Sequence, residues 1–171
     1  MWMVANIAYD EVELKKNVKE KGGKVSFKKG DTKADVARKL QEHYFNYATK
    51  VLQKRRGICE GYASLFYELC KASEIECDVV WGLASNYLKK IERYKKSKSM
   101  TTNHAWNKVK LNGQWLFIDV TWASKSTYDG KRHESDYYNP YYYLTTEDKP
   151  FITHVENKKK SKQRNEWAGN Y

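Results

Sequence analysis

The stretch Gly57-Ile58-Cys59-Glu60-Gly61-Tyr62-Ala63 marks the point where a polar, basic segment gives way to an apolar run that ends near residue 72. Within this run the apolar residues recur at spacings of three and four and cover more than one face, as in a helix buried inside a domain: Ile58, Tyr62, Leu65, Phe66, Leu69 and Cys70. The sequence therefore predicts a core helix with Cys59 in its first turn.

A cysteine in the first turn of a helix lies where unpaired backbone N–H groups and the positive end of the helix dipole both favour thiolate over thiol. The same N–H groups can hold a developing oxyanion. The alternative is that Cys59 is a small buried hydrophobe, which is the commoner role of a cysteine. Residues further along the chain must decide between these interpretations.

The 171 residues, with 40% hydrophobic content, suit a single domain that buries its own core, and no segment is long and apolar enough to span a membrane. We assign residues 1–157 to this domain and residues 158–171 to a basic C-terminal tail. The first eight residues are apolar but lack a basic leader and a small-residue cleavage site. We expect an excised domain, or an exported or cell-surface chain whose signal was removed, and the compartment stays unknown.

The other two cysteines, Cys70 and Cys77, do not indicate a disulfide or a metal site. Eleven residues of helix would separate Cys59 from Cys70 by about 16 Å, far beyond disulfide reach. A bond between Cys70 and Cys77 would strain a short loop, and no pair of cysteines has zinc-site spacing. We expect both thiols to be buried, and we expect no metal and no cofactor.

The formal net charge of +11 comes mostly from Lys-rich runs at residues 15–33, 89–98 and 158–164. Such runs are usually solvated faces or tails. Nucleic-acid binding needs basic groups combined with aromatic platforms or a reading motif, which these runs lack. We therefore expect nucleic acid not to be a partner and favour attraction to acidic surfaces or substrates.

Taken in order, the chain predicts a helix over the first twenty residues and a second helix opened and capped by Asp31. Residues 74–84 carry the β-branched and aromatic pattern of a strand. Residues 86–102 are polar and basic, and we interpret them as a long surface loop, which in a compact domain is often functional.

Residues 104–122 predict a β-hairpin, because Asn112-Gly113 between two alternating runs is the strongest short-range hairpin signal. A two-residue turn sets Leu111 opposite Gln114, and stepping outward pairs Trp106 with Asp119 and His104 with Thr121. His104 and Asp119 then become diagonal neighbours on one face, close enough for their side chains to meet. With a helix-start cysteine, they form a candidate set of nucleophile, base and orienting carboxylate.

Three motifs, in order along the chain, resemble those of the transglutaminase-like superfamily, most closely its kyphoscoliosis-peptidase-like branch. They are Arg56-Gly57-Ile58-Cys59-Glu60-Gly61-Tyr62-Ala63, His104-Ala105-Trp106-Asn107 and Asp119-Val120-Thr121-Trp122. The resemblance extends from Ile7 to the segment Tyr141–Leu144, which looks like the family's closing strand. The basic segment 86–103 and the tail after residue 156 depart from the family pattern, so the substrate surface is expected to be peculiar to this protein.

The resemblance implies an α+β fold of the papain-like, transglutaminase-core type, with the nucleophile helix packed on an antiparallel β-sheet. It also implies Cys59 as nucleophile, His104 as base and Asp119 as the carboxylate that orients the base.

Other residues admit two interpretations. Gln53 lies six residues before Cys59, the offset at which papain-like proteases place an oxyanion-hole glutamine, but it equally fits an exposed polar residue at a helix end. Trp106 and Trp122 either line a substrate-binding wall or pack the hairpin, and large amphipathic side chains can do both.

A thiolate, imidazole and carboxylate together attack a carbonyl and form a thioester; water as acceptor gives amide hydrolysis, and an amine gives crosslinking. On the family resemblance we favour a protease-like, cysteine-dependent enzyme acting on polypeptides. The alternatives are a protein-crosslinking transglutaminase and a non-catalytic binding module with the same fold. We further hypothesise that the basic segment 89–98 selects acidic polypeptide or cell-envelope partners, against the alternative of a solvated insertion.

Overall fold

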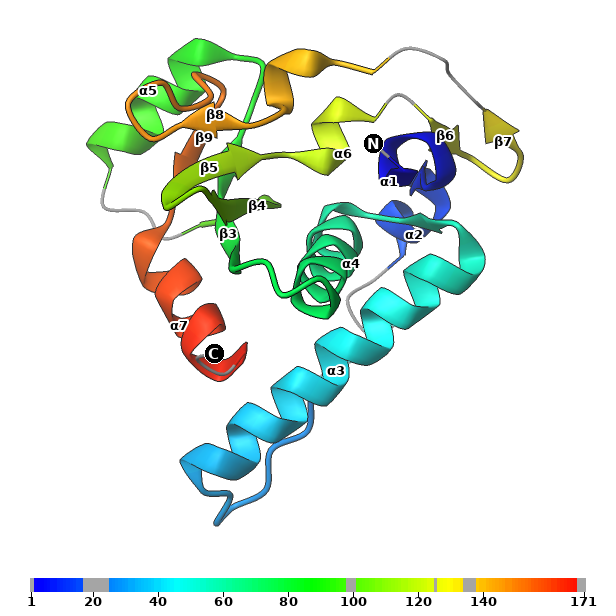
Figure 1. The fold of residues 1–171 in the computed structure, drawn as a ribbon, viewed down its shortest axis with the longest axis vertical. Coiled ribbons are helices and arrows are strands. Elements are labelled where there is room, and N and C mark those ends of the chain that lie inside the picture. The colour runs from blue at the N-terminus through cyan, green and yellow to red at the C-terminus, as the bar shows by residue number, and fades with distance from the viewer. Residues whose placement is uncertain (1, 17–24, 98–100, 125, 134–137, 169–171) are drawn as a thin grey trace.

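Helix α4 (Cys59–Ala72) lies in the middle of the molecule, as the apolar run predicts (Figure 1). The computed structural model describes residues 2–16, 25–97, 101–124, 126–133 and 138–168. Buried side chains lie on several faces of α4 and pack into the core. The residues that it buries are Gly61, Tyr62, Ala63, Ser64, Leu65, Tyr67 and Cys70. A helix surrounded in this way fixes the position of its first residue, Cys59.

The larger sheet has five strands in the order β8-β5-β4-β3-β9, and every neighbouring pair is antiparallel. Its strands are β3 (Cys77–Ala84), β4 (His104–Leu111), β5 (Gln114–Ile118), β8 (Thr145–Thr146) and β9 (His154–Glu156). Helix α4 packs against β3 and β4. The predicted α+β fold, with the Cys59 helix on an antiparallel sheet, is therefore confirmed.

The hairpin of β4 and β5 has the predicted turn and register. Asn112 and Gly113 have φ angles of 50° and 81°, and Leu111 pairs with Gln114. The ladder runs to the pair of Asn107 with Ile118. Beyond it, the predicted pairings of Trp106 with Asp119 and of His104 with Thr121 are wrong, because Asp119 caps helix α6 (Val120–Ala123) and the chain does not continue the strand.

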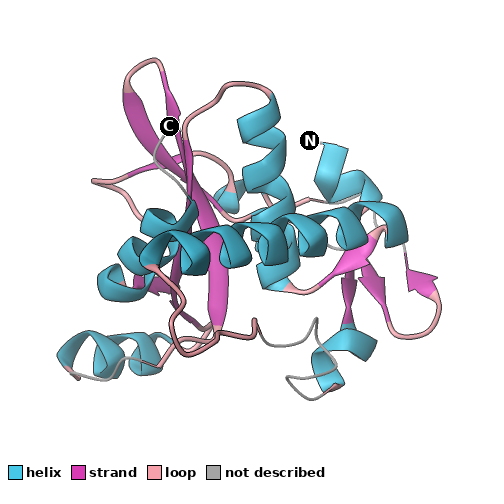
Figure 2. Ribbon diagram, turned by 90° about the horizontal axis from the view of Figure 1, so that it is seen from below, coloured by secondary structure: helices cyan, strands magenta, loops and turns pink. Residues whose placement is uncertain are grey.

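A smaller sheet joins the N-terminus to the middle of the chain. Its strands are β1 (Ala8–Asp10), β2 (Arg56–Gly57), β6 (Thr127–Tyr128) and β7 (Arg132–His133), in the order β2-β1-β6-β7. Strand β1 runs parallel to both of its neighbours. The two sheets lie on opposite sides of the helical layer (Figure 2).

The single helix predicted for the first twenty residues is wrong over the part that the structure describes. Two short helices, α1 (Trp2–Asn6) and α2 (Glu11–Lys15), flank β1. The reason is that the backbone around Tyr9 hydrogen-bonds to the neighbouring strands, and Asp10 caps α2 by accepting a bond from the Glu13 N–H. Residues 17–20 lie outside the described residues.

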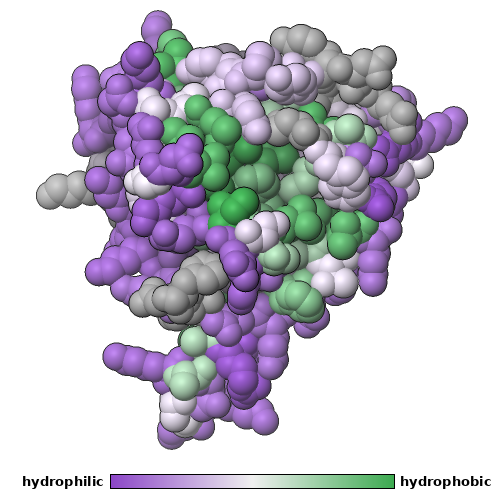
Figure 3. Space-filling view, in the orientation of Figure 1, coloured by the Kyte–Doolittle hydropathy of each residue, from purple (hydrophilic) through white to green (hydrophobic). Residues whose placement is uncertain are grey.

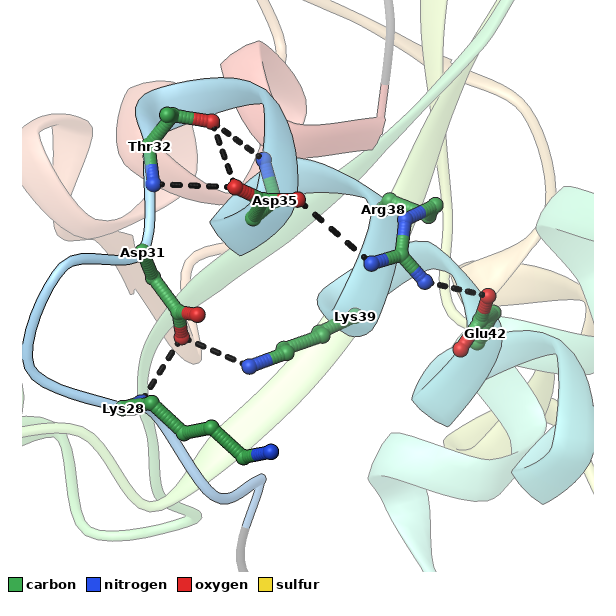
Figure 4. Close-up of polar contacts among 7 residues, drawn as sticks. All are labelled: Lys28, Asp31, Thr32, Asp35, Arg38, Lys39 and Glu42. Carbon is green, nitrogen blue, oxygen red and sulfur yellow. Dashed lines mark hydrogen bonds and ion pairs between the residues drawn. The ribbon is translucent and has the colours of Figure 1, made fainter.

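Helix α3 (Lys33–Lys54) begins one residue later than predicted, and its cap is Thr32 rather than Asp31. Thr32 and Asp35 form a reciprocal capping box (Figure 4). Asp31, which precedes the cap, instead accepts a hydrogen bond at 2.6 Å from Nζ of Lys39, a residue further along α3.

The predicted long loop between β3 and β4 is wrong in part, since it contains helix α5 (Leu88–Lys96). Ile91 anchors this helix, with 1% of its surface exposed, and the charged side chains point outward. Leu88, Ile91 and Tyr94 recur at a spacing of three, which is a helical signal, but the many basic residues around them led to the interpretation as a loop. Residues 98–100 of this segment lie outside the described residues.

The predicted closing strand at Tyr141–Leu144 is also wrong. Residues Pro140–Tyr142 form a 3-10 helix, η1, in which proline occupies the first turn and Asn139 accepts a bond from the Tyr141 N–H. Strand β8 follows η1, and the edge strand on the opposite side of the sheet is β9.

Helix α7 (Lys158–Ala168) lies in the segment that the sequence suggested as a tail, and it packs against β3 and α3. Among the described residues, no strand pairs with Cys77–Trp81 on the β9 side of β3, because β9 pairs only with Gly82–Ala84. Ser161 and Asn165 of α7 accept hydrogen bonds there from the N–H groups of Trp81 and Val79. Side chains of α7 thus replace part of a missing strand.

Hydrophobic residues gather over α4 and the neighbouring sheet on the face seen in Figure 1, and hydrophilic residues surround them (Figure 3). Within the described part of the chain, no helix has both the length and the apolar character that crossing a membrane requires.

Candidate active site

Cys59 is the first residue of α4 and is half-buried. Its predecessor, Ile58, occupies the N-cap position and provides no side-chain hydrogen bond to the helix. The N–H groups of the first turn have no acceptor within the helix, so they are available to a group placed beside the thiol. A helix begun by an aliphatic residue is therefore suited to binding a developing negative charge at Cys59.

His104 and Asp119 are brought together from the start of β4 and the end of β5. His104 Nε2 lies 2.6 Å from Asp119 Oδ2, and the exposed fractions of the two residues are 6% and 0%. Cys59 hydrogen-bonds to the same imidazole. Because Nε2 faces Asp119, the nitrogen left for the thiol is Nδ1.

The interactions among Cys59, His104 and Asp119 raise the pKa of the imidazole and lower the pKa of the carboxylate. Burial alone would lower the pKa of His104, but the charge of Asp119, the hydrogen bond to it and the interactions with Cys59 raise that pKa to about 10. Burial would raise the pKa of Asp119, whereas His104 and His154 hold it below its usual range. The imidazole is thus kept protonated between a carboxylate and a thiol, the state in which it can pass a proton to a leaving group.

A second histidine, His154 of β9, contacts the same carboxylate oxygen, and sequence reasoning missed it. Its Nε2 lies 2.9 Å from Asp119 Oδ2, and it is 8% exposed. The two residues are 35 positions apart: Asp119 follows β5 and His154 lies in β9, on opposite sides of the sheet centre. A lone histidine in a short strand offers no local pattern that could have revealed this contact.

The two predicted tryptophans surround His104 in different ways. Trp106 is 3% exposed and stacks with the imidazole at a centroid distance of 6.0 Å. Trp122 is half-buried and lies 5.6 Å from the same ring. Trp122 is thus the more exposed of the two, and the substrate-wall role of both remains a prediction.

Gly82 of β3 allows these groups to pack closely. It pairs with His104 on one side and with Glu156 of β9 on the other. A Cβ atom at this position would come within 2.0 Å of the Val155 carbonyl oxygen and 2.6 Å of the Trp106 ring. The absence of a side chain therefore lets β9 approach β3 and places His154 near Asp119.

Gln53 lies on the last turn of α3 and is exposed, unlike the buried pair of His104 and Asp119. Its assignment as an oxyanion donor remains a prediction.

Tyr9 of β1 lies nearer the reacting groups. Burial first, and then the charges of Cys59, Glu11 and other acidic groups including Asp119, raise the pKa of Tyr9 to about 12. Tyr9 thus stays a neutral hydrogen-bond donor at neutral pH.

His104, Asp119 and His154 also have the donor types of a metal site, and their ligand atoms lie within 4.8 Å of one another. The two contacts to Asp119 Oδ2, at 2.6 and 2.9 Å, have the lengths of hydrogen bonds. Both contacts would have to open before an ion could be bound among the three ligand atoms at metal–ligand distances.

A groove lies on the side of this cluster that faces α5. Its inner wall includes Trp106, Phe117, Phe151 and His154. Charged residues from α5, β9, α7 and the loop after β8 also line it: Lys95, Glu147, Glu156 and Lys158. A ligand in the groove would therefore meet aromatic rings next to the imidazoles and mixed charge at the rim.

The fold and the site define an α+β domain in which a thiol, an imidazole and a carboxylate meet where a buried helix begins beside an antiparallel sheet. The chain belongs to the transglutaminase-like superfamily, whose family model matches residues 2–120. This range contains Cys59, His104 and Asp119 and ends before His154.

Individual relatives are similar over a limited region. The chain is 31% identical over 99 residues to the kyphoscoliosis peptidases of Mus musculus and Homo sapiens, covering 57% of this chain and 14% of each relative. It is 29% identical over 108 residues to cytokinesis protein 3 of Schizosaccharomyces pombe, covering 63% of this chain and 12% of that protein. The chain thus spans a small part of the length of these relatives.

Proposed function

We propose that the protein is a cysteine-dependent enzyme that cleaves or transfers acyl groups of polypeptides, with Cys59 as nucleophile, His104 as acid and base, and Asp119 as the orienting carboxylate. The observation that carries the proposal is the buried 2.6 Å contact of His104 Nε2 with Asp119 Oδ2, on an imidazole that also hydrogen-bonds to Cys59. Membership of the transglutaminase-like superfamily supports it.

The proposed reaction has two stages, formation of a thioester on Cys59 and its breakdown by an acceptor. The Cys59 thiolate, whose proton is held by His104, attacks an amide carbonyl carbon, a C–S bond forms as the C=O π bond opens, and the oxyanion is stabilised by N–H groups of the first turn of α4. The tetrahedral intermediate collapses, the C–N bond breaks, and His104 gives its proton to the departing amine. An acceptor then attacks the thioester, His104 takes the acceptor's proton, and the thiolate leaves.

The acceptor decides which reaction the enzyme performs. Water gives hydrolysis of a peptide or glutamine amide, and a lysine amine gives a crosslink. We favour hydrolysis, because two similar relatives are named peptidases. The candidate from another class is a polypeptide-binding domain without chemistry, and cytokinesis protein 3 is a similar protein whose name states no reaction.

A thiol probe and a separate turnover assay test the proposal. In separate samples, wild-type protein and Cys59→Ala are incubated either with an electrophilic activity probe or with a denatured mixed-sequence protein, the latter with and without an added primary amine. The proposal expects a probe adduct and new peptide termini or amine incorporation with wild type only. A folded wild type that takes up no probe and forms no product would leave the binding domain as the better explanation.

The substrate is further proposed to be acidic, on account of α5. Helix α5 carries Lys89, Lys90, Arg93, Lys95 and Lys96 on its surface, and Lys95 lines the groove beside His154 and Trp106. Cations in this position would attract an acidic polypeptide toward the reacting groups. Cell-envelope polymers of negative charge are the second ligand with the same chemistry.

A further inference from the structure

We propose that His154 is a positioning residue of the active site, which holds the Asp119 carboxylate in the orientation that His104 requires; this inference rests on the proposed function. The observation is that one carboxylate oxygen, Asp119 Oδ2, is shared between two buried imidazoles, at 2.6 Å from His104 Nε2 and 2.9 Å from His154 Nε2.

The positions of the protons follow from the donor and acceptor types. An ionised carboxylate has only acceptors, so both Nε2 atoms must carry a proton. The other oxygen, Asp119 Oδ1, accepts a bond from the Trp122 backbone N–H at 3.0 Å. Asp119 therefore receives three N–H donors, and no oxygen of this fully buried carboxylate lacks a partner.

His154 is itself held in this tautomer from its other side. With the proton on Nε2, its Nδ1 is an acceptor, and Thr153 Oγ1 lies 2.8 Å from it and must donate. Burial, as the largest effect, lowers the pKa of His154 and favours the neutral ring that this arrangement needs.

The carboxylate needs support because of its place in the fold. Asp119 follows the last paired residue of β5 and caps the four-residue helix α6; its backbone N–H and C=O are bonded to Tyr142 and Ala123, so hydrogen bonds to its side chain set the direction of the carboxylate. His154 comes from β9, on the other side of β3 and β4. The contact thus ties Asp119 to a distant part of the sheet.

Packing is the competing explanation for His154. Its ring lies among aromatic neighbours, with centroid distances of 4.9 Å to Trp106, 4.8 Å to Trp122 and 5.1 Å to Phe151. A phenylalanine would preserve these contacts but donate no hydrogen bond. A glutamine would preserve an N–H near the Nε2 position but lose the ring.

Two variants of His154 therefore distinguish a hydrogen-bonding role from a packing role, according to which of them lowers the reactivity of Cys59 more. The rate of Cys59 alkylation by a small neutral reagent is measured for His154→Phe and His154→Gln. The proposal expects a loss of about tenfold or more in the Phe variant, the size of one hydrogen bond, and near wild-type reactivity in the Gln variant. The reverse order would overturn it. His133→Gln, which breaks an exposed pair with Asp129 at 3.0 Å, is the matched control and should change nothing.

A second measurement on the wild-type protein needs no folded variant. Long-range ¹H–¹⁵N NMR of the imidazole rings between pH 6 and 8 should show His154 neutral, with its proton on Nε2. A proton on Nδ1 of His154 would contradict the proposal. An unreactive Cys59 in the wild-type protein would overturn the proposed function. The NMR measurement determines the His154 tautomer independently of that result, so the two failures can be distinguished.

Discussion

His104 of β4 and Asp119 of the β5–α6 junction are in contact at 2.6 Å, although Asp119 is a helix cap and not a strand residue. One carboxylate thus performs two tasks: Oδ1 accepts the Trp122 N–H of α6, and Oδ2 accepts from the imidazole. The short helix that ends the hairpin therefore sets the direction in which Asp119 faces His104.

Cys59 should be the reactive thiol. Cys70 and Cys77 are 6% and 2% exposed and hydrogen-bond to each other, whereas Cys59 is half-buried and bonded to His104. Mass mapping after a limiting dose of iodoacetamide at neutral pH should find the label on Cys59. The control is denatured protein, in which all three cysteines should react; labelling of folded protein mainly on Cys70 would contradict the assignment.

Asp119→Asn should lower the reactivity of Cys59 while leaving the fold intact. The amide can still accept the Trp122 N–H, but its NH₂ group would face the two imidazole donors and disturb the His104 tautomer. By analogy with other triads, we expect a loss of about 10²- to 10⁴-fold in turnover. The alkylation rate and the circular dichroism spectrum are compared with wild type, and unchanged reactivity in a folded variant would remove Asp119 from the set.

The stability that Asp119 contributes should disappear in acid. Its pKa is lowered in the folded protein, so the contribution is present above the unfolded-state pKa, near 4, and is lost as pH falls toward the folded-state value. Urea unfolding of wild type and Asp119→Asn should differ by about 2–4 kcal/mol at pH 6. The difference should shrink steadily below pH 4, and a gap independent of pH would contradict the ionised state of Asp119.

Gly82→Ala should destabilise the fold strongly. The new methyl group would lie 2.0 Å from the Val155 carbonyl oxygen, and backbone cannot move aside as a flexible side chain can. We expect a loss of about 3 kcal/mol or more in the free energy of unfolding. Gly113→Ala is the comparison, because open space surrounds this turn residue and only its positive φ is unfavourable, at a cost of about 1 kcal/mol. An equal loss of unfolding free energy in the two variants would show that β9 can move away from β3 at little cost.

Lys95→Gln with Lys96→Gln should weaken turnover of acidic polypeptides at low salt and leave alkylation of Cys59 by a neutral reagent unchanged. The attraction acts over about 10 Å at 0.1 M salt, so added salt should bring variant and wild type together. The control is the double change of Lys28 and Lys29 to Gln, which alters the net charge equally at residues that do not line the groove. Identical salt dependence in both variants would leave α5 as a solvated helix.

The sequence by itself determined the features whose causes are local. The period of the apolar residues after Ile58 specified α4, and Asn112-Gly113, which readily adopt positive φ, specified the hairpin register as far as Ile118. From these two elements, the sequence could predict that Cys59, His104 and Asp119 are the residues to examine.

Tertiary structure alone decided the features that depend on distant partners. His154 acquires its contact because Gly82 lets β9 approach β3, and neither residue carries a local signal of the other. Helix α5 depends on burying Ile91, and β1 forms because two later strands lie beside it. Such hydrogen bonds and packing contacts join residues far apart in the chain, so they contribute free energy only once the rest of the fold has brought those residues together.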